Sequence, residues 1–151
     1  MTQKELGIAI AFDGHEGQVR RDGQPYIIHP LGVMLMMEQD GFPEEPYHTG
    51  AILHDSHEDT DWRIDRMRRA GVGERVLRIV EILSKSDNQT DEEYERAIVA
   101  SYEASQIKVR DMQHNLISNP KPHKVLQYLA RLAKIEEVWG FDYNPNLENT
   151  F

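Results

Sequence analysis

The chain has 151 residues, a formal net charge of −9 and no cysteine. Its length allows one domain with a substantial core. No apolar run approaches the roughly 20 residues of a membrane helix, and the first residues lack the basic start of an export signal. We therefore expect one cytoplasmic domain. A surface this acidic repels a phosphate backbone, which argues against duplex nucleic acid as a partner, and the lack of cysteine leaves histidine and carboxylate to hold any metal.

Helical periodicity dominates the chain, and no alternating pattern is long enough to indicate a sheet. Apolar faces, capping residues and Gly or Pro breaks predict eight helices, with Thr60 as the N-cap of the fourth. In chain order these helices cover residues 6–12, 29–37, 51–59, 61–70, 76–83, 90–98, 107–116 and 125–138. We expect residues 1–140 to form one all-α domain, with residues 141–151 as a C-terminal tail.

The densest group of candidate ligands is the segment His54-Asp55-Ser56-His57-Glu58-Asp59. It follows the apolar run 51–53, so a helix that begins in the core turns strongly polar. Side chains four apart share a helix face, which puts His54 over Glu58 and Asp55 over Asp59. The alternative is a solvated acidic surface helix, but an unpaired aspartate next to a buried turn is costly.

Two further segments add candidate ligands. His29 begins an apolar helix, where the alternative is a structural histidine. Asp111 lies between apolar neighbours, where the alternative is a salt bridge to Lys108 or Arg110. Together with the pair at 54–55 they make a set of two histidines and two carboxylates. Such nitrogen and oxygen ligands suit Mn²⁺, Fe²⁺ or Zn²⁺, and the mixed hard character favours Mn²⁺.

The order H…HD…D is typical of the HD phosphohydrolase superfamily. More narrowly, the segments HEGQVRRDGQPYIIHP at 15–30, HDSHEDT at 54–60 and IKVRDMQHN at 107–115 resemble the hydrolase domain of RelA/SpoT proteins and the small alarmone hydrolases, which include the metazoan SpoT homologue. The resemblance is based on three separated motifs in this order and extends over roughly residues 1 to 140. The resemblance implies an all-α HD-domain helical bundle.

The resemblance also implies a chemistry. It implies Mn²⁺, or another divalent transition metal, held by His29, His54, Asp55 and Asp111. Glu58 and Asp59 match the acidic pair of the family, which orients and activates the attacking water. In the family, the reaction removes the 3′-pyrophosphate from (p)ppGpp, the alarmone of the stringent response, and leaves GDP or GTP.

Substrate contacts carry over from the same resemblance. The positions that match contacts to the base, ribose or phosphates are Arg20, Arg21, Asn115, Ser118, Lys124 and Tyr128. A planar guanidinium stacks well on a purine, which suits Arg20, whereas Arg21 replaces the usual lysine of the family. The alternative for this arginine pair is a solvated turn.

Three hypotheses about function follow. The first is an alarmone hydrolase that acts on (p)ppGpp or an analogue such as ppApp. The second keeps the HD chemistry on another nucleotide, such as NADPH or a dNTP. The third is a catalytically silent nucleotide-binding module, for which neither the metal nor Glu58 is needed. With no synthetase half following, we expect degradation and not synthesis. The sequence leaves the oligomeric state and the role of His57 open.

Overall fold

The fold was analysed in a computed structural model that describes residues 1–118 and 120–140. Across these residues the regular structure is helical, apart from one isolated bridge between Val19 and Pro25. The helices are α1 (Gln3–Gly14), α2 (Ile28–Gln39), α3 (Glu45–Leu53), α4 (Ser56–Asp59), α5 (Ile64–Ala70), α6 (Glu74–Leu83), α7 (Asp91–Val99), α8 (Tyr102–Ser118), the short 3₁₀ helix η1 (Pro122–Lys124) and α9 (Val125–Val138). The expected all-α class is confirmed.

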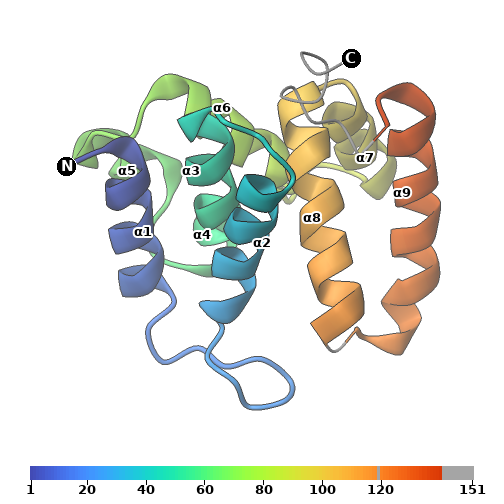
Figure 1. Cartoon of the computed structure of the whole chain (residues 1–151), viewed down its shortest axis with the longest axis horizontal. Coiled ribbons are helices and arrows are strands. Elements are labelled where there is room, and N and C mark those ends of the chain that lie inside the picture. Colours follow the sequence, from blue (N-terminus) through green and yellow to red (C-terminus); the bar gives the residue numbers. More distant parts are fainter. Residues whose placement is uncertain (119, 141–151) are drawn as a thin grey trace.

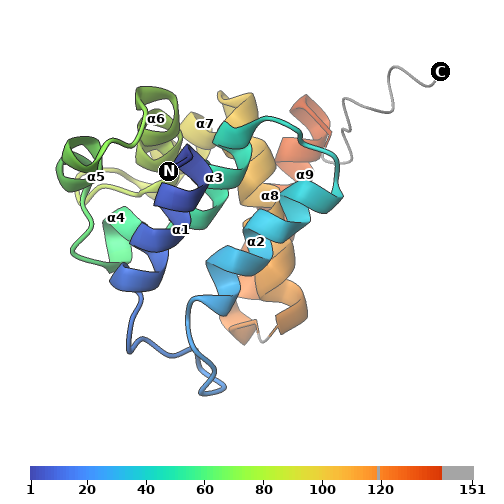
Figure 2. The same ribbon diagram turned by 60° about the vertical axis from the view of Figure 1, so that its left-hand side comes forward.

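Helix α3 is the centre of the packing. It contacts α1, α2, α6 and α8, and its buried positions are Tyr47 and the whole run from Thr49 to Leu53. Figures 1 and 2 show α1 and α2 next to α3, with α8 and α9 forming the other side of the bundle. Because α3 is enclosed by its neighbours, the residue that follows Leu53 emerges in the interior of the protein.

Two glycines let these helices approach closely. A Cβ on Gly7 of α1 would lie 2.9 Å from Thr49 Cγ2 and 3.1 Å from Ile52 Cγ2 on α3. A Cβ on Gly50 of α3 would lie 3.0 Å from Ile107 Cδ1 on α8. Interiors packed to this density respond to the addition of even one methyl group.

The helix predicted to run from Ala51 through Asp59 is interrupted, which corrects the predicted geometry. Helix α3 ends at Leu53 and α4 begins at Ser56. The His54 ring bonds through Nδ1 to the carbonyl oxygen of Ala51 at 2.6 Å. In a continuous helix that oxygen would accept from the amide of Asp55. The side chain of His54 therefore competes with the backbone and ends the helix one residue before itself.

The start of the next helix also differs from the prediction. Thr60 closes α4 and does not cap α5: its hydroxyl donates to the carbonyl oxygen of Ser56 (2.7 Å) and accepts from the amide of Trp62 (2.9 Å). Helix α5 begins at Ile64, whose amide donates to His57 Nδ1 at 3.0 Å. The open question about His57 thus has a structural answer, because its ring satisfies one of the free amides at a helix start.

Most other expected elements are present. The capping box of Thr90 and Glu93 begins α7, Gly71 ends α5 in the left-handed conformation, and α9 has the predicted bounds. The segment 15–27 connects α1 to α2 and extends below the helices in both ribbon views. The tail expected over 141–151 lies outside the described residues. No helix in the described part of the chain is long and apolar enough to span a membrane.

The close contact between α1 and α3 can be tested by overpacking. We expect Gly7→Leu to lower the free energy of unfolding by about 1–3 kcal/mol, because the added side chain has no room against Thr49 and Ile52. The matched control is Ala9→Leu on the exposed face of the same helix, which should leave stability nearly unchanged. Urea unfolding of both variants measures the difference, and equal stabilities would contradict the close contact.

Candidate functional site

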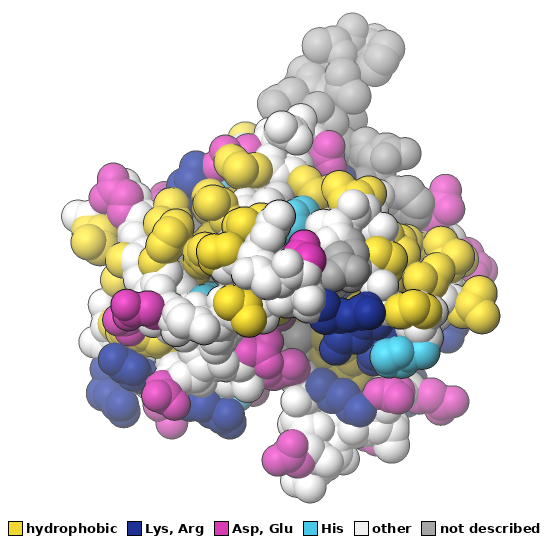
Figure 3. All heavy atoms as spheres, turned by 90° about the horizontal axis from the view of Figure 1, so that it is seen from below, with side chains coloured by type: hydrophobic (Ala, Val, Ile, Leu, Met, Phe, Trp, Pro, Cys, Tyr) yellow, Lys and Arg dark blue, Asp and Glu magenta, His cyan; other side chains and the backbone are white. Residues whose placement is uncertain are grey.

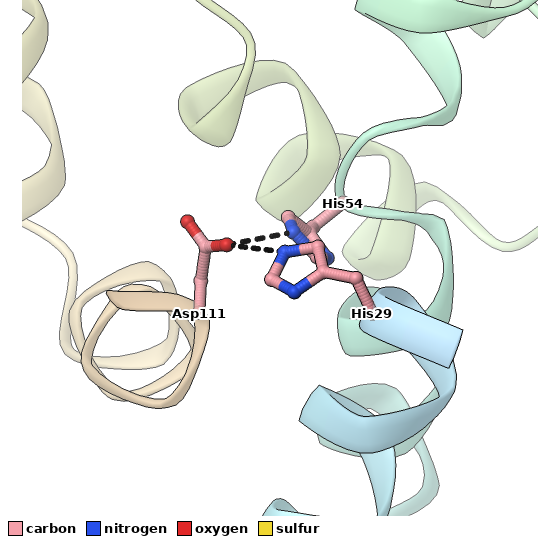
Figure 4. A group of neighbouring side chains, drawn as sticks. All are labelled: His29, His54 and Asp111. Carbon is pink, nitrogen blue, oxygen red and sulfur yellow. Dashed lines mark hydrogen bonds and ion pairs between the residues drawn. The ribbon is translucent and has the colours of Figure 1, made fainter. Parts of the chain in front are cut away.

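Three separate helical segments bring His29, His54 and Asp111 together. His29 is the second residue of α2, His54 directly follows α3, and Asp111 lies in the middle of α8. Asp111 Oδ1 is 2.7 Å from His29 Nε2 and 3.2 Å from His54 Nε2 (Figure 4). All three side chains are buried. This group could hold a metal ion, since one ligand atom from each residue lies within 4.8 Å of the others.

Asp55, the fourth predicted ligand, lies beside the same group. Its Oδ2 is 3.1 Å from His54 Nε2 and 3.7 Å from His29 Nε2, and it accepts a hydrogen bond of 2.7 Å from the Tyr26 hydroxyl. His54 and Asp55 are the two residues at the interruption between α3 and α4. Neighbouring side chains on a continuous helix diverge by about 100°, whereas here His54 and Asp55 converge. The structure thus brings together all four residues predicted as ligands.

The electrostatics of the group favour a positive charge at its centre. Burial alone would lower the pKa of His54, but Asp55 and Asp111 outweigh burial and raise it well above its usual value. Burial would likewise raise the pKa of Asp111, but the Lys108 ammonium and His54 hold it well below the usual range. The carboxylates are therefore ionised and attract either protons on the imidazoles or a cation.

Glu58 and Asp59 lie on α4, one turn beyond this group and accessible to solvent. Glu58 accepts a hydrogen bond from the Lys85 amide. Partial burial raises the pKa of Glu58; the bond from Lys85 opposes this, and Asp55 and Asp59 add to it. Partial burial and then Asp55 also raise the pKa of Asp59. Both carboxylates line a polar hollow of about 880 Å³.

A second hollow, of about 290 Å³, carries the predicted substrate contacts. Its lining residues include Arg20, Arg21, Tyr26, Asn115, Lys121, Lys124 and Tyr128. No carboxylate is present among the described residues that line it, although the chain as a whole carries −9. Figure 3 looks onto this end of the molecule, where dark-blue Lys and Arg side chains gather. We call this hollow the basic cleft.

Hydrogen bonds connect the basic cleft to α8. One terminal nitrogen of Arg20 donates to Asn115 Oδ1 (3.0 Å) and to Ser118 Oγ (3.3 Å), while the other is buried without a hydrogen-bond partner. Asn115 lies 3.4 Å from Asp111 Oδ1 through its amide nitrogen, which joins the cleft to the buried carboxylate. Ser118 bonds to Arg20 and is not one of the residues that line the hollow, so it lies next to the cleft behind this arginine.

Comparisons with known proteins agree with this arrangement. No protein-family model matches the chain. A protein of Aquifex aeolicus named guanosine-3′,5′-bis(diphosphate) 3′-pyrophosphohydrolase is 35% identical over 138 residues, which are 87% of this chain and 17% of that protein. A GTP pyrophosphokinase of Streptomyces antibioticus is 31% identical over 140 residues, 87% of this chain and 16% of that protein. The chain thus spans less than a fifth of either relative.

A solved structure resembles the whole chain. It is described as a metazoan ortholog of SpoT that hydrolyzes ppGpp and plays a role in starvation responses, and it matches with a TM-score of 0.75. The match covers 99% of this chain and 91% of the other, at 22% sequence identity, so it establishes the fold. The chain is an HD-domain protein similar to the RelA/SpoT hydrolases. The predicted resemblance and the predicted HD fold are confirmed.

The donor set of this RelA/SpoT-like chain fits a divalent cation. Two imidazole nitrogens and two carboxylates face one another and are largely shielded from water. They come from three helical segments. Nitrogen and oxygen donors of this kind suit Mn²⁺, Fe²⁺ and Zn²⁺. A cation at their centre would satisfy the charges that otherwise raise the pKa of His54.

Three residues around the group were not predicted as site residues. Tyr26 bonds to Asp55, the half-buried Lys108 ammonium is 2.7 Å from Asp111 Oδ2, and His114 is 2.9 Å from His29 through their Nδ1 atoms. Partial burial, and then the charges of His29 and Arg20, lower the pKa of His114 to about 4. All three lie inside the motifs that resemble RelA/SpoT hydrolases, and this position is the feature of the sequence that could have identified them. The salt bridge between Lys108 and Asp111, weighed as the alternative for Asp111, does form.

The raised pKa of His54 predicts how stability depends on pH in the presence of a chelator. The stabilisation that protonated His54 gives the folded state is complete below about pH 6.5, the pKa of histidine in the unfolded chain. It is lost as the pH rises toward the higher pKa of the folded state, at about 1.4 kcal/mol per pH unit. We expect the free energy of unfolding in EDTA to decrease from pH 6.5 to pH 9.

Two variants separate this effect from other titrations. His54→Asn should flatten the profile over that range, because the buried imidazole is gone, whereas His123→Asn at an exposed site should retain it. Urea unfolding at intervals across the range gives the comparison. A stability that increases with pH in the unaltered protein would contradict the assigned charge state.

Proposed function

We propose that this chain is a metal-dependent hydrolase that removes the 3′-pyrophosphate from (p)ppGpp or a close purine analogue such as ppApp. One observation carries the proposal: Asn115 joins a largely buried cluster of two histidines and two carboxylates to a basic cleft, and the Glu58–Asp59 pair follows this cluster on α4. The names of the Aquifex relative and of the metazoan structural neighbour support this substrate. A cytoplasmic setting is part of the proposal.

The basic cleft supports a small anionic nucleotide as the ligand. Four positive charges line it, and no carboxylate is among the described lining residues; the cations are Arg20, Arg21, Lys121 and Lys124. Arg20 keeps one buried nitrogen without a partner, so it retains a donor for a ligand. A guanidinium stacks on a purine, while Lys124 and Tyr128, one turn apart on the same side, suit the phosphates and the sugar.

The cluster supports a divalent cation, which we propose to be Mn²⁺, held by His29, His54, Asp55 and Asp111. Such an ion polarises a phosphoryl oxygen and lowers the pKa of bound water. Lys108 and Tyr26 hold Asp111 and Asp55 by hydrogen bonds from outside the cluster. These contacts fix the orientation of the two carboxylates.

Glu58 is suited to act as the general base. A carboxylate with a raised pKa is a better proton acceptor near neutral pH than an ordinary glutamate. As the water oxygen forms its bond to the phosphorus next to the ribose, Glu58 takes the water proton, and Asp59 orients the water. The bond between that phosphorus and the 3′ oxygen breaks, the 3′ oxygen is protonated by solvent, and pyrophosphate leaves with GDP or GTP as the other product.

A panel of nucleotides with Mn²⁺ tests the proposed substrate. The purified protein should release GDP and pyrophosphate from ppGpp, and faster than it acts on NADPH or a dNTP. Product chromatography identifies what is released. Turnover of NADPH or a dNTP alone would move the chain to another HD phosphohydrolase activity, and binding of ppGpp without turnover would make it a nucleotide-binding module.

The role of Glu58 gives a separate prediction. Glu58→Gln should reduce turnover by about 10²–10⁴-fold, since the amide cannot accept the water proton. Mn²⁺ binding, measured by calorimetry, should persist because Glu58 is outside the ligand cluster. Glu92→Gln, an exposed residue on α7, should retain full activity. Full activity of Glu58→Gln would remove Glu58 from the mechanism.

A further inference from the structure

His114 lies on the side of His29 that faces away from Asp111. Its Nδ1 is 2.9 Å from His29 Nδ1, and the two ring centroids are 4.9 Å apart. The other nitrogen of His29, Nε2, is 2.7 Å from Asp111 Oδ1 in the ligand cluster (Figure 4). His29 thus lies between a carboxylate and a second imidazole, and both of its nitrogens are engaged.

The chemistry of imidazole determines which of the two histidines donates this hydrogen bond. Two ring nitrogens at hydrogen-bond distance need one proton between them. If His29 Nε2 offers its lone pair to a cation, the proton of the neutral ring is on Nδ1. His29 Nδ1 then donates, and His114 Nδ1 accepts. The contact can therefore fix both the tautomer and the orientation of His29.

Gly32 is the second observation that points to this contact. It lies one turn beyond His29 inside α2, where glycine is less favourable than alanine. A Cβ at this position would lie 2.4 Å from His114 Nε2 and 2.6 Å from its Cδ2. Both atoms belong to the ring, so any larger residue at position 32 must displace the imidazole. Gly32 thus provides the space in which His114 reaches His29.

His114 is also anchored from the side of the basic cleft. The Ser118 hydroxyl donates to the His114 carbonyl oxygen at 2.5 Å and lies 3.4 Å from His114 Nδ1. Arg20 donates to that same hydroxyl at 3.3 Å. The backbone of α8 at His114 is therefore connected to the residues that line the cleft, which limits movement of the ring away from His29.

We propose that His114 is a positioning residue for the metal site, which accepts a hydrogen bond from His29 Nδ1 and holds its Nε2 toward the ligand cluster. Gly32 is the partner that makes this position accessible. The inference rests on the proposed metal site, and it adds a residue outside the four ligands. Outer partners of metal-binding histidines usually affect metal affinity by about 10–100-fold when they are removed.

Mn²⁺ binding alone, measured by calorimetry on the purified full chain, tests the proposal. His114→Leu should raise the Kd about 10–100-fold, since it removes the acceptor. His114→Asn should recover most of the affinity, because the amide oxygen can take the place of Nδ1 as acceptor. Asp55→Ala, a proposed ligand, provides the reference for a severe loss. Thermal unfolding in EDTA verifies that each variant is folded.

Gly32→Ala tests the same contact without altering either histidine. It should weaken Mn²⁺ binding in the unaltered background but have little further effect in a His114→Ala background, where no ring is displaced. A Kd for His114→Leu within twofold of the unaltered protein, or equal losses for the Leu and Asn variants, would overturn the role of His114. If the unaltered protein binds no Mn²⁺, the metal site itself is refuted, and with it this role.

Discussion

The carboxylate of Asp111 is the interaction on which the rest of the site depends. One oxygen faces the two imidazoles from α2 and the end of α3, and the other accepts from Lys108. Burying an aspartate costs free energy unless it is paired, so these partners are needed for the fold as well as for chemistry. The same carboxylate connects α8 to α2 and to the residue that follows α3.

The net charge of −9 is unevenly distributed, so that a basic cleft and an acidic hollow lie in different parts of the molecule. Cations gather in the cleft formed by the 15–27 segment and the ends of α8 and α9, while the acidic pair of α4 opens into a different hollow. Local potential at a site depends on the nearest groups, because charges further away than about 10 Å are screened in salt. An acidic protein can therefore offer a local attraction for phosphates.

Helical periodicity, which is a local property, predicted the all-α fold, and the resemblance of three motifs to RelA/SpoT hydrolases predicted which residues gather at its centre. It did not predict the end of α3, since that depends on competition between the His54 ring and the backbone for the Ala51 oxygen. Nor did it reveal Tyr26 or His114 as partners, because their contacts with Asp55 and His29 span 29 and 85 positions of the chain.

The interruption between α3 and α4 has a consequence for how the chain tolerates changes in length. The side chains of His54 and Asp55 reach one centre at the point where the helix is interrupted between Leu53 and Ser56. Inserting or deleting a single residue just before His54 would rotate both side chains relative to the preceding core by about 100°. The exposed connection from Ser86 to Asn88, by contrast, lies between α6 and α7 and tolerates such changes better. The HD dipeptide is therefore a marker of a helix end, and its spacing to the preceding core is as constrained as its chemistry.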